Sequence, residues 1–215
     1  DGSLAWAKSW GTPKFDEADG QMVVDENYIY VSGRMEAANV LLGGQAVIAK
    51  FSKVSGDFVD HRIWGGKIFS DDLGMTSDGT YLYVAGLTLD HGNSGQIFLL
   101  KYDKGLNLLW QQIWGGAGGE SARAAAVDST GNILIAGNTD SYGNGKGDIA
   151  LLSFNPEGIL NWSSLWGGSL KDATQGIAVS SEFVYLVGST ENGSQGLNDA
   201  LLIKADAHTG QMPMP

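Results

Sequence analysis

The chain has 215 residues, with 24 acidic and 13 basic side chains that give a formal net charge of −11 at pH 7. This charge repels phosphate backbones, and no apolar run approaches the roughly 20 residues that span a bilayer, so we expect neither a nucleic-acid partner nor membrane insertion. The absence of cysteine excludes disulfides, thiolate metal sites and a cysteine nucleophile.

The first ten residues are predicted to form a β-strand, because Leu4, Trp6, Lys8 and Trp10 alternate along the chain and so share one face. The same pattern returns at 108–114 and 160–166 and, with an acid replacing the inner tryptophan, at 58–64. Each copy ends on Trp-Gly, and the copies are spaced by about 50 residues. An all-β repeat of about 40–50 residues is typical of a propeller blade.

Three further strands follow each Trp-Gly pair. The first is rich in small residues and is predicted to be innermost, where strands crowd around an axis; it covers 21–25, 73–77, 122–128 and 176–180. The second is aromatic and β-branched, and it ends on glycine at Gly33, Gly86, Gly137 and Gly188, which indicates a positive φ or a close backbone approach. The third follows a long loop and is continuously apolar, so it is predicted to lie buried between neighbouring blades.

The fourth unit ends Q-M-P-M-P without a tryptophan strand of its own. We therefore predict an all-β, four-bladed β-propeller of four-stranded antiparallel blades, in which the N-terminal strand 3–10 closes the ring and removes two unpaired edges. The predicted blades are 11–64, 65–114, 115–166, and 167–210 together with 3–10. The alternative is a processed or excised four-blade piece of a larger ring.

These repeats resemble the bacterial and archaeal β-propeller repeat that is common in secreted and cell-surface proteins. The resemblance covers essentially the whole chain and rests on a glycine-ended aromatic strand, an apolar strand, a D-x-x-G turn and L-x-W-x-x-x-W-G-G. It implies an extracellular or cell-surface location. The segment A-D-A-H-T-G from Ala205 also resembles quinoprotein-type propeller repeats, but the chain has too few blades and no cysteine pair, so their cofactor is not carried over.

An acid follows each Trp-Gly pair shortly before the innermost strand, at Asp16, Asp71, Glu120 and Asp172. If these strands surround an axis, the four carboxylates would ring one mouth of the channel and repel one another by about 2 kcal/mol per pair at an effective dielectric of ~20. A bound Ca²⁺ would relieve that repulsion, because it prefers oxygen ligands. Alternatively, the acids cap turns within their own blades.

The long loops concentrate polar side chains that could bind a glycan or an ion. These candidates are Asp90, Asn93, Asp140, Tyr142, Asn144, Asp148, Glu191, Asn192 and Asp199. The same residue types are ordinary turn formers, and plain loop chemistry is the favoured explanation for them. Most tryptophans repeat four residues apart on one strand face, which indicates packing rather than a lectin surface.

The loop after the first glycine-ended strand is apolar, unlike its three counterparts. Met35, Val40, Leu41 and Leu42 would form a contact surface for a partner if they are exposed. Alternatively, this loop folds back over the ring and is buried.

Sequence motifs for catalysis are absent: there is no G-x-S-x-G elbow, no phosphate loop and no zinc-ligand spacing among the three histidines. The main expectation is thus a non-catalytic extracellular or cell-surface module that contacts a protein or glycan partner through its loops and holds an axial Ca²⁺. Two alternatives are an extracellular polysaccharide hydrolase or lyase with its site at the channel mouth, and one domain of a surface-layer or filament subunit. A hydrolase requires a pocket with two carboxylates within reach of one substrate atom.

Overall fold

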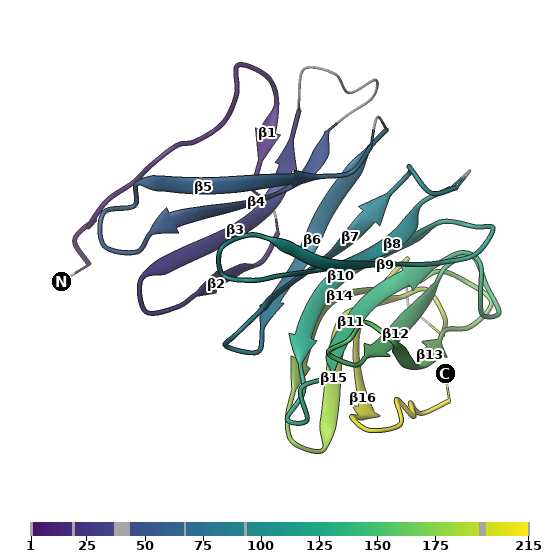
Figure 1. The fold of residues 1–215 in the computed structure, drawn as a ribbon. Coiled ribbons are helices and arrows are strands. Elements are labelled where there is room, and N and C mark those ends of the chain that lie inside the picture. Colours follow the sequence, from purple (N-terminus) through teal and green to yellow (C-terminus); the bar gives the residue numbers. More distant parts are fainter. Residues whose placement is uncertain are drawn as a thin grey trace.

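The computed structural model describes residues 2–18, 20–36, 44–66, 68–92, 94–193 and 197–214. This part of the chain contains sixteen strands in four antiparallel sheets, which follow one another along an arc (Figure 1). No helix in these ranges is long and apolar enough to cross a membrane.

The first three sheets follow the predicted order from the innermost strand to the tryptophan strand, and the fourth has the first three strands of that order. The first sheet contains β1 (Asp16–Glu17), β2 (Met22–Val24), β3 (Tyr28–Met35), β4 (Gln45–Ser52) and β5 (Phe58–Trp64). The second contains β6 (Ser70–Ser77), β7 (Leu82–Thr88), β8 (Gln96–Tyr102) and β9 (Leu108–Trp114). The third contains β10 (Glu120–Val127), β11 (Ile133–Thr139), β12 (Asp148–Phe154) and β13 (Leu160–Trp166). The fourth contains β14 (Asp172–Val179), β15 (Phe183–Thr190) and β16 (Asp199–Asp206).

The core lies between neighbouring sheets rather than within any one of them. β8 and β12 are buried at every residue, as their continuous apolar sequences predict, because each has a sheet on both sides. Phe98 and Leu100 pack towards the first sheet, whereas Ile97 and Leu99 pack towards the third. β16 has the same kind of sequence, but its Leu202 remains 70% exposed because no described strand covers that face.

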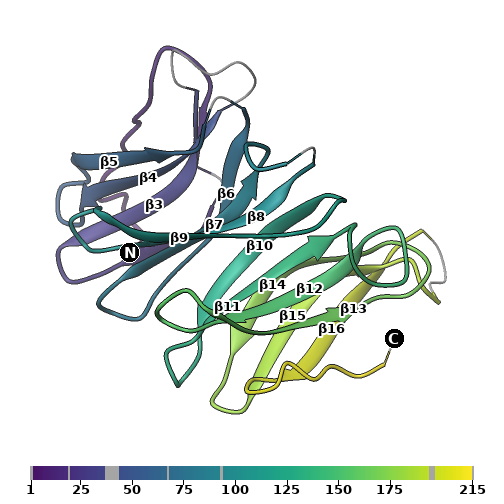
Figure 2. The ribbon, with the colours of Figure 1, turned by 45° about the vertical axis from the view of Figure 1, so that its right-hand side comes forward.

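The small-residue strands are innermost, as predicted, and they contact one another across the axis of the arc (Figure 2). Gln21, just before β2, connects three sheets at this point. Its side-chain oxygen accepts hydrogen bonds from the backbone N–H groups of Met75 in β6 and Ala125 in β10, both at 3.1 Å. The two donors lie beside bulges in their strands, where the ladder pairing shifts.

Replacing Gln21 with leucine is expected to lower the free energy of unfolding by about 2 kcal/mol, because two N–H groups lose their acceptor. Gln21→Glu keeps an oxygen at the same distance along the side chain and should cost less. Urea unfolding of both variants measures the difference. Equal stability of Gln21→Leu and the unmodified chain would show that the bridge contributes nothing.

The structure corrects the predicted closure of the ring by residues 3–10. In the described part of the chain, β16 pairs only with β15, and the fourth sheet has three strands. The N-terminal segment lies against the first sheet instead, where the Trp10 ring stacks on Phe58 at 5.3 Å and Lys8 pairs with Asp57 at 2.9 Å. The two ends of the chain consequently lie at opposite ends of the arc (Figure 1).

The physical reason is the apolar face of the first sheet, on which no other sheet of the described residues packs. Residues 6–10 and the side chains of Val31, Val47, Ala49 and Phe51 line one pocket there. The indole rings find apolar cover within their own end of the molecule, so the chain does not need to reach the fourth sheet to bury them.

Candidate functional site

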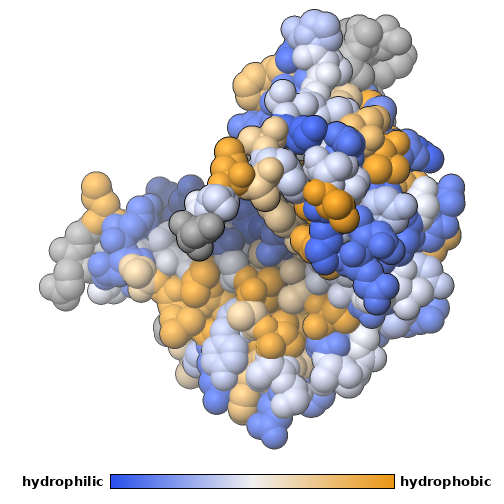
Figure 3. Space-filling model, turned by 90° about the vertical axis from the view of Figure 1, so that its left-hand side faces the viewer, coloured by the Kyte–Doolittle hydropathy of each residue, from blue (hydrophilic) through white to orange (hydrophobic). Residues whose placement is uncertain are grey.

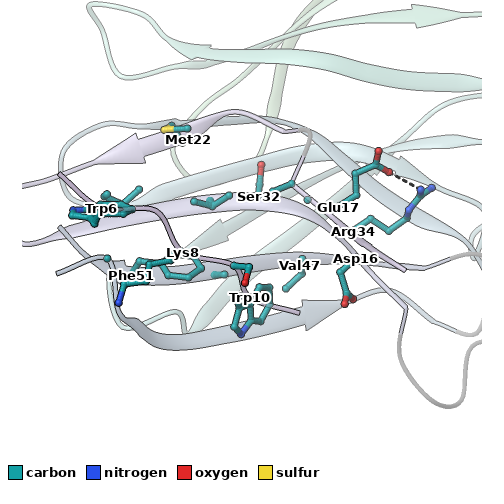
Figure 4. A pocket seen from close by; sticks show the side chains of 17 residues that line it. Trp6, Lys8, Trp10, Asp16, Glu17, Met22, Ser32, Arg34, Val47 and Phe51 are labelled. Carbon is teal, nitrogen blue, oxygen red and sulfur yellow. Dashed lines mark hydrogen bonds and ion pairs between the residues drawn. The ribbon is translucent and has the colours of Figure 1, made fainter. Parts of the chain in front are cut away.

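A cavity of about 420 Å³ lies between residues 6–10 and the first sheet (Figure 4). Trp6 lies at one end of this pocket, and Asp16 and the Glu17–Arg34 pair lie at the other. Trp10 and Phe51 add aromatic surface to the same lining. The pocket therefore combines aromatic walls with a charged end.

Short local contacts position the charged end. In β1, Asp16 and Glu17 pair with Met35 and Arg34 of β3. Asp16 accepts hydrogen bonds from the backbone N–H and the hydroxyl of Thr12. These contacts hold both carboxylates beside the Trp-Gly turn that ends the N-terminal segment.

Arg34 is the residue of this pocket that the sequence did not identify. Its guanidinium group donates to the Glu17 carboxylate at 2.8 Å, and it lies 3.9 Å from the Asp71 carboxylate. The same group lies 5.1 Å from the ring centres of Phe15 and Phe69. The sequence does mark this residue, because the repeated glycine of the second strand is followed directly by arginine only in the first unit. The guanidinium holds Glu17 in place and presents donors to a ligand.

The surface around this end of the molecule carries both hydrophobic and hydrophilic side chains. Figure 3 shows hydrophobic side chains gathered beside a hollow on the face seen from the end where the first sheet lies. Trp6 is 38% exposed and Met22 is 64% exposed, and both line the pocket. A ligand could therefore reach aromatic and polar groups together.

The four acids predicted to ring the axis do not converge on one ion. Three of them occupy the first position of an innermost strand and cap a Trp-Gly turn: Glu120 accepts from Gly116 N–H and Asp172 from Gly168 N–H, both at 2.9 Å, and Asp16 accepts from Thr12 N–H. Asp71 is the second residue of β6 and faces Arg34. Among the described residues, no three histidine or acidic side chains are grouped to hold a metal. The turn-capping alternative is therefore correct for Asp16, Glu120 and Asp172, whereas Asp71 faces Arg34 instead.

The second blade shows why the capping interpretation holds. In this blade Ser70 occupies the position of the capping acid. A serine has no carboxylate with which to accept hydrogen bonds from the backbone N–H groups of the turn. Asp90, from the following loop, supplies the carboxylate instead and accepts hydrogen bonds from Gly66 N–H and Ile68 N–H. Each Trp-Gly turn is thus capped by a carboxylate, although the residue that carries it differs.

The other loop candidates lie in separate loops, where several of them form hydrogen bonds with neighbouring turns. The Tyr142 hydroxyl donates to the Gly115 carbonyl at 3.0 Å, and Asn144 N–H donates to Asp148 at 3.0 Å. Asn192 donates to Asp172 at 2.7 Å. The remaining ones are Asp140 before its glycine-rich loop, Glu191 at the end of β15, Asp199 at the start of β16, and Asn93, which lies outside the described residues. Ligand binding by these loops remains a prediction.

The predicted contact surface is corrected at Met35. Met35 is the last residue of β3 and is only 4% exposed, because it packs into the sheet. Val40, Leu41 and Leu42 lie outside the described residues. The tryptophan strands do pack as predicted, since the Trp64 ring lies 4.4 Å from Phe98 and the Trp110 ring 6.1 Å from Tyr83.

No family model and no curated protein matches the chain. The chain does match solved structures. The WD40 domain of Pan2 from Neurospora crassa superposes with a TM-score of 0.57 and 13% identity over 91% of this chain and 50% of that one. A putative 6-phosphogluconolactonase from Bacteroides uniformis gives 0.51 and 14% over 89% and 54%. The Bombyx mori GH32 β-fructofuranosidase BmSUC1, a mutant in complex with sucrose, gives 0.51 and 13% over 92% and 51%.

The fold is a β-propeller. The chain spans about half the length of these propellers. The all-β propeller of antiparallel blades predicted from the repeats is therefore confirmed, while the identity of the repeat family is confirmed only at the level of the propeller.

The comparisons also correct the main functional expectation. Glycoside-hydrolase propellers are among the matching structures, and the β-fructofuranosidase holds sucrose. This finding contradicts the expectation of a non-catalytic module.

Proposed function

We propose that this β-propeller acts in polysaccharide hydrolysis and that the pocket beneath residues 6–10 is its sugar site. The observation that carries the proposal is the pairing, in one cavity, of exposed tryptophan with the carboxylates of Asp16 and Glu17. A sugar ring presents apolar C–H faces to an indole and hydroxyl groups to carboxylates and guanidinium groups. The pocket offers both kinds of surface.

The chemistry requires a pair of carboxyl groups at the scissile bond. One protonates the leaving oxygen, and the other either attacks the sugar or activates a water molecule. Asp16 and Glu17 both line the pocket, and because they are consecutive in β1 their side chains leave the strand on opposite sides, so the two carboxylates would approach a sugar from different directions (Figure 4). Arg34 holds Glu17 by an ion pair of 2.8 Å. The guanidinium group also fixes the position of the Glu17 carboxylate, which suits the nucleophile or base role.

An extracellular or cell-surface location fits this activity, because polysaccharides are encountered there. The resemblance of the repeats to those of secreted and cell-surface propellers supports the same location. The partner in this proposal is a glycan chain that enters from the open end of the arc.

Replacing Trp6 with alanine is expected to weaken oligosaccharide binding at least about tenfold, which corresponds to about 1.4 kcal/mol for a lost stacking surface. Leu4→Ala is the matched control, because Leu4 belongs to the same segment, is 80% exposed and does not line the pocket. Titration calorimetry against a panel of fructan, xylan and arabinan oligosaccharides measures both variants.

Release of reducing sugars from the same panel tests hydrolysis directly. Cleavage of at least one polysaccharide by the unmodified chain, with loss of binding in Trp6→Ala alone, supports the proposal. Absence of both binding and cleavage across the panel, or equal losses in Trp6→Ala and Leu4→Ala, would overturn it.

A further inference from the structure

The junctions between neighbouring sheets share one construction. At each, the first residue of the third strand in one sheet meets the Trp-Gly turn that leads to the next sheet. At the first junction the Gln45 amide donates to the carbonyls of Gly65 at 3.0 Å and Gly66 at 2.9 Å. At the second, the Gln96 amide donates to the Gly116 carbonyl at 3.1 Å and to the Glu120 carboxylate at 3.3 Å.

The third junction has an acid in the place of the glutamine. Asp148 is the first residue of β12, as Gln96 is of β8, and Asp172 takes the place of Glu120 at the start of β14. An ionised aspartate has no proton to donate, so the hydrogen bond that joins the second junction cannot form here. Two carboxylates meet where the second junction has an amide and a carboxylate.

The two carboxylates are close together and buried. Each residue is 1% exposed. A Cβ atom placed on Gly167 would lie 1.8 Å from Asp148 Oδ1 and 2.9 Å from Asp172 Oδ2, so both groups border the same glycine. No ion pair joins either carboxylate to a lysine or arginine within the described residues.

One oxygen of each carboxylate is satisfied and the other is not. Asp148 Oδ2 accepts from the N–H groups of Asn144 at 3.0 Å and Gly145 at 3.2 Å. Asp172 Oδ2 accepts from Gly168 N–H at 2.9 Å and from the Asn192 amide at 2.7 Å. Asp148 Oδ1 and Asp172 Oδ1 are buried without any hydrogen-bond partner in the described structure. A buried carboxylate oxygen without a partner requires a proton, a water molecule or a cation to satisfy it.

The surroundings are rich in further oxygens. Gly145 packs against the backbone carbonyls of Gly168 and Leu170, which lie 2.3 and 2.9 Å from the position of a Cβ on that glycine. Positive φ angles at Gly143 (104°) and Gly147 (133°) allow this close approach. Burial, followed by the negative charges of Asp172 and Asp140, raises the pKa of Asp148. Negative charge at Asp148 and Asp172 and two carbonyl oxygens beside Gly145 thus occur in the same loop region.

We propose that Asp148 and Asp172 bind a Ca²⁺ ion that joins the third and fourth sheets, in the role that the Gln96 amide has at the second junction. Two carboxylates supply the charge, and backbone carbonyls and water are the oxygen ligands that complete such a shell. This site lies at the opposite end of the arc from the pocket beneath residues 6–10, so its role is to hold sheets together rather than to bind sugar.

The test compares the unmodified chain with Asp148→Gln, which places an amide opposite Asp172 much as Gln96 lies opposite Glu120 and should fold. Thermal unfolding at pH 7 is followed in chelator and in increasing CaCl₂, with MgCl₂ as the control for general ionic effects. Calcium at about 100 times its Kd is expected to raise the Tm of the unmodified chain by roughly 5 °C or more. Asp148→Gln should show no calcium-dependent shift.

Titration calorimetry with CaCl₂ provides the direct readout, with one binding event expected in the unmodified chain and none in Asp148→Gln. The same calcium response in both proteins would overturn the assignment to this junction. A chain that ignores calcium but gains stability as the pH falls towards 4 would show that a shared proton, rather than a cation, joins the two carboxylates. Because sugar binding is measured separately, failure here leaves the function proposed for the pocket unaffected.

Discussion

The Asp16→Asn and Glu17→Gln variants are each expected to lose polysaccharide cleavage by about a hundredfold to ten-thousandfold. This is the usual contribution of a positioned general acid or base. Both carboxylates line the pocket that also contains Trp6 and Trp10, so a bound sugar would contact them directly. Initial rates at saturating polysaccharide measure the loss, and oligosaccharide affinity should change far less than the rate.

Two controls separate this catalytic effect from damage to the fold. Asp16 also caps the turn at Thr12, so thermal unfolding must show that Asp16→Asn remains folded at the assay temperature. Glu36→Gln removes a nearby acid that pairs with Lys14 at 3.2 Å and does not line the pocket, and it should keep full activity. Cleavage that survives unchanged in both pocket variants would show that the carboxylates of the reaction lie elsewhere.

The second large effect is expected on stability, at the repeated glycines, which lie two residues before the end of the second strand of each blade. Replacing Gly137 with alanine should lower the free energy of unfolding by about 3 kcal/mol or more. The new Cβ would lie 2.5 Å from the backbone oxygen of Ser121, 3.1 Å from Ile97 Cδ1 and 3.3 Å from Ala122 Cα. A backbone oxygen cannot rotate away as a side chain can, and β10 and β11 are paired on both sides of this point.

Gly119→Ala is the matched control, because its Cβ would meet nothing nearer than Asp140 Oδ2 at 3.5 Å. That change should cost less than about 1 kcal/mol. Chemical unfolding of both variants measures the contrast. Similar stabilities for the two would mean that the inner strand shifts easily and that the repeated glycine has no packing role.

The same close approach recurs in other blades, which explains why glycine returns at this position. A Cβ on Gly33 would lie 2.1 Å from the Glu17 carbonyl oxygen, and one on Gly188 would lie 1.9 Å from the Ala173 carbonyl oxygen. None of these glycines has a positive φ. The sequence allowed two explanations for these glycines, a positive φ and a close backbone approach, and the close approach is correct. The sequence alone could not decide between them, because the approach is made by the bulged inner strands.

The acids illustrate a different limit of sequence analysis. Turn capping is local, so it could be named as an alternative for Glu120 and Asp172 from their distance to Trp-Gly alone. The sequence could not reveal that Asp90 takes the place of the capping acid in the second blade, because Asp90 belongs to a later loop. Arg34 escaped notice for the same reason, since its partners come from β1 and β6.

By itself, the sequence determined most of the strands, their order within each sheet and the burial of the third strand in the second and third sheets, because each depends on alternation, turn residues and a repeat of about 50 residues. Only the tertiary structure decided that residues 2–10 lie against the first sheet and not beside β16, and that Asp148 meets Asp172 while Asp16 faces a pocket. These outcomes depend on which apolar faces are left uncovered and on which side chains distant parts of the chain bring together, and no local pattern encodes either.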